Sequence, residues 1–81
     1  MKQSTLEVLC YRIAVAQDRY GAFASTHEAL GVACEEWDEL RAAIHSNDLA
    51  QVKHECIDLA AVLIRLAESL DNPDVQKRSV K

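Results

Sequence analysis

The stretch Cys56-Ile57-Asp58-Leu59-Ala60-Ala61-Val62-Leu63-Ile64-Arg65-Leu66 governs how this chain folds, because it is apolar on most sides when wound as a helix. It forms the middle of a predicted helix over residues 49–70, in which two apolar stripes follow helical spacing. The first stripe consists of Val52, Cys56, Leu59, Leu63, Leu66 and Leu70, and the second of Ile57, Ala60, Ala61, Ile64 and Ala67. A helix with two such stripes must be central, and in 81 residues this indicates that a partner chain supplies part of its cover.

Two more helices are predicted before the central one. The first is amphipathic, about four turns long, with a cap at residue 4 or 5 and an end at Gly21, which adopts the left-handed conformation at little cost. The second starts at Ser25 or Thr26, and Ser25 with Glu28 fits a capping box. The turn at residues 45–48 then leads into the central helix, with Asn47 or Asp48 as its cap.

A short fourth helix is predicted at the C-terminal end. Asp71-Asn72-Pro73 stops the central helix, and Pro73 is suited to the first position of a helix over residues 74–79. The predicted fold class is therefore all-α. We expect an antiparallel bundle of three long helices plus a short C-terminal helix, with a four-helix core completed by oligomerisation. Residues 1–81 are expected to form a single domain.

Charge and cysteine content limit the classes of function. Thirteen acids stand against nine bases, a net charge of −4, which argues against binding a nucleic acid polymer or an anionic membrane. No apolar run is long enough to span a bilayer. The odd number of cysteines, Cys10, Cys34 and Cys56, fits neither a disulfide framework nor a zinc motif. We expect them to be buried core thiols in a protein of the reducing cytoplasm.

Two pairs of acidic residues are the candidate functional feature. Glu36 with Glu39, and Glu55 with Asp58, are each three residues apart, so each pair shares one face of its helix. Neighbouring antiparallel helices can direct all four carboxylates to one point, where they would suit Mg²⁺. A solvated acidic face is the commoner meaning of either pair alone, whereas two pairs on adjacent helices favour a metal site. Glu35 is placed to accept the proton of a metal-bound water.

The same residues resemble a known family. Glu35-Glu36-Trp37-Asp38-Glu39-Leu40 followed by Glu55-Cys56-Ile57-Asp58 is similar to the signature of the all-α nucleoside triphosphate pyrophosphatases, the MazG-like superfamily. The flanking segments Ser25-Thr26-His27-Glu28-Ala29 and Asp58-Leu59-Ala60-Ala61-Val62-Leu63-Ile64-Arg65 resemble small stand-alone and phage-type members. The resemblance covers roughly residues 23–70.

The resemblance implies hydrolysis of a nucleoside triphosphate, NTP or dNTP, to the monophosphate and pyrophosphate. It makes Glu36, Glu39, Glu55 and Asp58 the ligands of Mg²⁺, with Mn²⁺ as a substitute, and Glu35 the candidate general base. It also implies a homodimer or homotetramer. A related enzyme acting on another phosphoanhydride, such as phosphoribosyl-ATP, and a non-catalytic helical dimerisation or binding module remain as alternatives.

We weigh a functional role against a structural one for five other side chains. His27 is either a contact to substrate phosphate or base, or a surface histidine, and Arg65 either meets a phosphate or pairs with an acid of the bundle. Lys53 and His54 are expected to be solvated. Trp37, on the acidic helix but pointing away from the acids, is expected to serve packing or an interface rather than base stacking.

Overall fold

The computed structural model describes residues 1–71, and these residues form three α-helices and no β-strand. The helices are α1 (Gln3–Tyr20), α2 (Thr26–His45) and α3 (Leu49–Ser69). The prediction of an all-α fold with three long helices is confirmed at this level. The fourth helix predicted over residues 74–79 lies outside the described residues.

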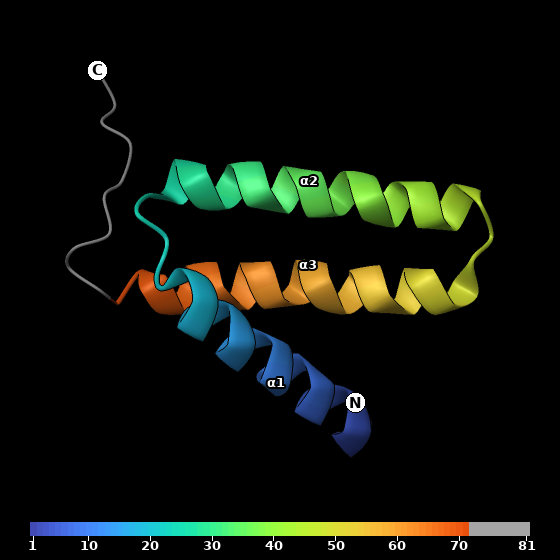
Figure 1. Cartoon of the computed structure of the whole chain (residues 1–81), viewed down its shortest axis with the longest axis horizontal. Coiled ribbons are helices and arrows are strands. Elements are labelled where there is room, and N and C mark those ends of the chain that lie inside the picture. Colours follow the sequence, from blue (N-terminus) through green and yellow to red (C-terminus); the bar gives the residue numbers. More distant parts are fainter. Residues whose placement is uncertain (72–81) are drawn as a thin grey trace.

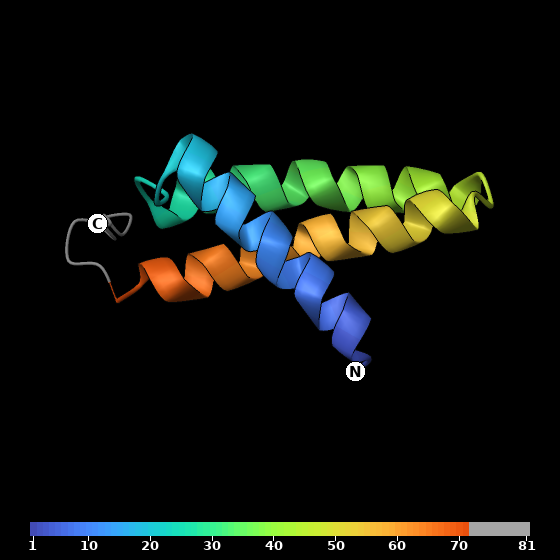
Figure 2. The same cartoon turned by 60° about the horizontal axis from the view of Figure 1, so that its bottom comes forward.

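Helices α2 and α3 form an antiparallel hairpin, and α1 crosses α3 obliquely (Figures 1 and 2). Helix α1 packs against α3 and not against α2. Consistent with this single contact, none of its residues is buried. The central position predicted for α3 is therefore confirmed within the described part of the chain.

The helix ends follow from local hydrogen bonds. Gly21 has φ +71° and its amide donates to the carbonyl of Gln17, so α1 ends at the predicted residue. Ser25 caps α2 by accepting from the amide of Glu28, and the Glu28 carboxylate reaches back to the amide of Ala24. The cap of α3 is Asp48, which accepts from the amide of Gln51.

The predicted cap of the first helix is wrong. Helix α1 begins at Gln3, and the preceding Lys2 makes no side-chain cap hydrogen bond. Because the first turn of this helix is exposed to water, its free amide groups need no side-chain partner.

The buried core of the described residues is small. Phe23, Ala29 and Val62 form its centre, with Val32, Ala33 and Leu66 packed around it. Among residues 1–71, no large side chain is fully buried. Small domains bury only a modest part of their apolar surface. A core of this size therefore gives the single chain limited stability.

The hairpin of α2 and α3 also has an exposed apolar face. Two rows of residues seven positions apart, and therefore on one helix face each, make up this open face. The rows are Leu30, Trp37 and Ile44 on α2, and Leu49, Cys56 and Leu63 on α3 with Leu70 directly after its end. Trp37 is 51% exposed and Leu63 50%, so Trp37 packs only partly within the chain.

The cysteine prediction is wrong for the single chain. Cys10, Cys34 and Cys56 are free thiols, and all three are exposed. Cys56 lies in the apolar row of α3 that no other helix of the described residues covers. Sequence periodicity placed it correctly in an apolar stripe, but packing leaves that stripe open.

Candidate metal centre

The two acidic pairs meet where α2 and α3 lie side by side. Glu36 and Glu39 come from α2, and Glu55 comes from the facing stretch of α3. These three carboxylates each offer an oxygen within 4.8 Å of the others. His54, Glu55 and Asp58 form a second group with the same spacing of ligand atoms. Glu55 belongs to both groups, so the two clusters are contiguous.

Two oxygen atoms in this cluster are buried without a partner. Glu55 is only 7% exposed; its Oε2 accepts a 2.7 Å hydrogen bond from the Gln51 amide, while its Oε1 has no partner. Glu36 Oε2 is likewise buried and unpaired. A buried carboxylate oxygen without a partner costs free energy, and a cation would remove that cost. Oxygen-only ligands from Glu36, Glu39 and Glu55 fit Mg²⁺ or Mn²⁺.

The pKa of Glu36 reflects its burial and the close approach of the other carboxylates. Burial raises its pKa from 4.5 to about 7, and the charges of Glu39, Asp58 and Glu55, in that order, contribute to the rise. All three other members of the predicted quartet therefore act on Glu36. A divalent cation bound among these carboxylates would reverse the shift, because positive charge favours the ionised form.

Asp58 is held by two residues that were not expected at the site. Its Oδ1 accepts a hydrogen bond from Arg12 of α1, and its Oδ2 lies 3.2 Å from His54 Nε2. His54 is exposed, as expected, but its ring also contacts Asp58 and Arg12, which the expectation of a simply solvated side chain did not include. A signal for His54 was present in the sequence, because His54 and Asp58 are four residues apart on one helix. Arg12 had no such signal, since it is 46 positions from Asp58.

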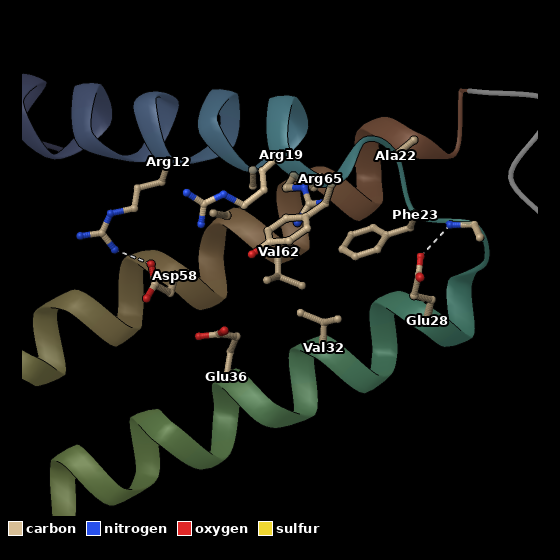
Figure 3. Close-up of a pocket in the computed structure, with 14 residues that line it drawn as sticks. Arg12, Arg19, Ala22, Phe23, Glu28, Val32, Glu36, Asp58, Val62 and Arg65 are labelled. Carbon is tan, nitrogen blue, oxygen red and sulfur yellow. Dashed lines mark hydrogen bonds and ion pairs between the residues drawn. The ribbon is translucent and has the colours of Figure 1, made fainter.

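A cavity of about 790 Å³ opens beside the carboxylates (Figure 3). Glu36 and Asp58 lie at one end of it, and their side chains point toward each other from α2 and α3. Arg12 and Arg19 line it from α1. The full lining is Arg12, Ala16, Arg19, Tyr20, Ala22, Phe23, Ala24, Glu28, Val32, Glu36, Asp58, Ala61, Val62 and Arg65. Its volume is within the range of small-molecule sites.

Arg65 is a buried arginine in the lining of the cavity, between Arg19 and Phe23 (Figure 3). It is 5% exposed, its Nη2 donates a 3.0 Å hydrogen bond to the carbonyl of Gly21, and its guanidinium lies 4.4 Å from the centre of the Phe23 ring. Arg65 forms no ion pair with an acid among residues 1–71, so the interpretation that it pairs with an acid of the bundle is wrong. Arg65 lines the cavity, which keeps the reading of a phosphate contact as a prediction.

The other two predicted site residues lie at the margin. Glu35 is exposed and belongs to neither group of metal-ligand atoms, although it adjoins Glu36 on α2. His27 is exposed in the first turn of α2 and does not line the cavity. Helical geometry explains both positions, because residues 27 and 35 point to a different side of α2 from Glu36.

Comparison with known proteins gives no relative from which to read a function. No family model matches the chain, and neither the curated proteins nor the solved structures include a significant match. Among the described residues, no helix combines the length and the apolar character needed to cross a bilayer.

Proposed function

We propose that this chain is a Mg²⁺-dependent nucleoside triphosphate pyrophosphohydrolase of the MazG-like kind, similar to its small stand-alone or phage-type members. The observation that carries the proposal is the pair of buried, partnerless carboxylate oxygens, on Glu36 and Glu55, where two acidic pairs meet. In this proposal Glu36, Glu39, Glu55 and Asp58 hold Mg²⁺ or Mn²⁺. When bound, the metal supplies an activated water and neutralises phosphate charge.

The chain's own residues would then bind and orient the substrate. The adjoining cavity presents three arginines and the Phe23 and Tyr20 rings, a combination that suits a charged polyphosphate and a planar base. Water would attack the α-phosphorus, the bond to the bridging oxygen of the β-phosphate would break, and pyrophosphate would leave. Glu35, the neighbour of Glu36, is the proposed acceptor of the water's proton.

We further propose that the active form is a homodimer or a dimer of dimers. The open apolar face of α2 and α3 has the seven-residue spacing of helices that pack side by side. Two hairpins placed face to face would form a four-helix core and would cover Trp37 and Leu63. This arrangement leaves the cavity accessible, because the cavity lies on the α1 side of the hairpin. The three free thiols are compatible with the reducing cytoplasm as the site of action.

A pyrophosphate-release screen tests the proposed reaction. The full chain is incubated with the standard NTPs and dNTPs, several oxidised or deaminated triphosphates and phosphoribosyl-ATP, with Mg²⁺, with Mn²⁺ and with EDTA. We expect metal-dependent release from at least one nucleoside triphosphate. Glu36→Gln and Glu55→Gln should each lower kcat/KM by at least about 100-fold, as expected for loss of a metal ligand.

Asp38→Asn is the matched control for these variants. Asp38 lies on α2, as Glu36 does, and its replacement removes the same charge. Within residues 1–71 its exposed side chain makes one ion pair, at 3.9 Å, with Arg41. Its activity should equal that of the wild type. Turnover that persists in both glutamate variants would refute the metal site, and a screen without any metal-dependent product would refute the proposed reaction.

A further inference from the structure

Arg12 is the one lysine or arginine, among residues 1–71, that pairs with a candidate metal ligand. Its Nη1 donates to Asp58 Oδ1, and its Nη2 lies 2.8 Å from His54 Nδ1. A guanidinium only donates hydrogen bonds, so His54 Nδ1 must accept. His54 Nε2 then carries the proton and donates to Asp58 Oδ2. Both oxygens of Asp58 are thus engaged by this pair of residues.

The Arg12 guanidinium thus supplies positive charge next to Asp58, where a bound cation would otherwise supply it. Asp58 Oδ1 cannot accept from Arg12 and bind a divalent cation along the same direction. Glu36 and Glu55 show the opposite state, because each keeps a buried oxygen without a partner. One member of the quartet is therefore neutralised by a residue of the chain, while two others are left open.

Helix α1 is suited to releasing Arg12. Of the described helices it packs against α3 only, and none of its own residues is buried. Arg12 also lines the cavity, together with Arg19 two turns further along the same helix. An Arg12 side chain that leaves Asp58 therefore has the cavity beside it, with a second arginine on the same wall (Figure 3).

We propose that Arg12 is an exchangeable counter-ion: it neutralises Asp58 while no divalent cation is bound, and it moves to the substrate's phosphates when a cation takes its place. The inference rests on the proposed function, since it assigns the triphosphate end of the cavity to Arg12. It makes Arg12 a competitor of the metal when the metal is alone and a contributor to binding when a polyphosphate is present. These two effects have opposite signs, which a merely structural role would not produce.

The test compares two affinities of the metal-free full chain with Arg12→Gln. Mg²⁺ binding is measured by calorimetry, and Mn²⁺ binding by electron paramagnetic resonance, each without polyphosphate. Both metals should bind about 3- to 10-fold more tightly to R12Q, because a part-buried ion pair no longer competes with them. Inorganic tripolyphosphate, titrated at saturating Mg²⁺, should bind about 10- to 100-fold more weakly, because a charge-assisted contact is lost. Arg12→Lys should keep wild-type Mg²⁺ affinity and still weaken tripolyphosphate binding, since an ammonium lacks the bidentate fork.

Two further variants separate exchange at Asp58 from a general loss of positive charge. Arg19→Gln removes a charge from the same cavity wall, but Arg19 forms no ion pair among the described residues; its only ring contact is with Tyr20. R19Q should therefore leave Mg²⁺ affinity within about twofold. Arg41→Gln, on the exposed side of α2, should change neither affinity.

Unchanged or weaker Mg²⁺ binding in R12Q, or unchanged tripolyphosphate binding, would overturn the inference while the metal centre stands. A wild-type chain that binds neither Mg²⁺ nor Mn²⁺ at millimolar concentration would overturn the metal centre and the inference together. Failure of the hydrolysis screen alone would refute the proposed reaction, whereas both binding measurements decide the role of Arg12 without turnover.

Discussion

Replacing Glu36 by Gln should stabilise the metal-free chain at pH 8 and have a much smaller effect, about a quarter as large, at pH 5. In the folded chain, burial and the charges of Glu39, Asp58 and Glu55 raise the Glu36 pKa to about 7, from 4.5 when unfolded. Between these values the folded state binds a proton that the unfolded state has lost, so stability falls as pH rises. The cost is absent below pH 4.5 and complete above pH 7 or so.

The size of the effect follows from the same shift. A pKa change of this extent corresponds to an upper limit of roughly 3 kcal/mol at pH 8. Glu36 is only half-buried beside an open cavity, so water screens the site. We therefore expect E36Q to raise the free energy of unfolding by about 1 kcal/mol at pH 8. In a domain of this size that equals a Tm increase of about 4–8 °C.

The assay is thermal unfolding followed by circular dichroism at pH 5 and pH 8 in EDTA, at one fixed protein concentration because self-association changes Tm. Glu35→Gln is the control, since it removes an exposed charge from the neighbouring position and should change stability by less than about 0.5 kcal/mol. Saturating Mg²⁺ should raise the wild-type Tm at pH 8 and raise the E36Q Tm much less. An equal effect of E36Q at both pH values, or a loss of stability at pH 8, would show that the carboxylates do not crowd one another as described.

The remaining predictions concern the open face and the buried arginine. Leu63→Glu and Trp37→Glu should each convert the self-associated chain to monomer in light scattering coupled to gel filtration, because a charge would be buried in the apolar contact. Tyr11→Glu, on an exposed part of α1, should leave the mass unchanged, and a wild-type chain that is already monomeric at micromolar concentration would refute the interface. Arg65→Ala should lower the free energy of unfolding in urea by about 2–4 kcal/mol, through loss of the hydrogen bond to a backbone carbonyl and of the contact with Phe23. A loss below about 0.5 kcal/mol would mean that Arg65 does not support the cavity.

Local signals were sufficient for three of the helix ends but not for the start of α1, which begins at Gln3 without a side-chain cap. Gly21, Ser25 and Asp48 each act through the backbone within four residues, so the end of α1 and the starts of α2 and α3 could be predicted from neighbouring residue types alone. The acidic pairs were equally local, since residues three apart share a helix face whatever the rest of the chain does. Antiparallel packing of two consecutive helices with a short connection then brought Glu36 and Glu55 together.

Contacts between distant parts of the chain were beyond such reasoning. Arg12 meets Asp58 across 46 positions, and Arg65 reaches the carbonyl of Gly21 across 44, because α1 crosses α3 at one particular angle. Helical periodicity is blind to that angle, as it reports which residues share a face and not which neighbour covers the face. The exposure of Cys56 has the same origin: its stripe on α3 is apolar by sequence, but α1 and α2 both pack on other sides.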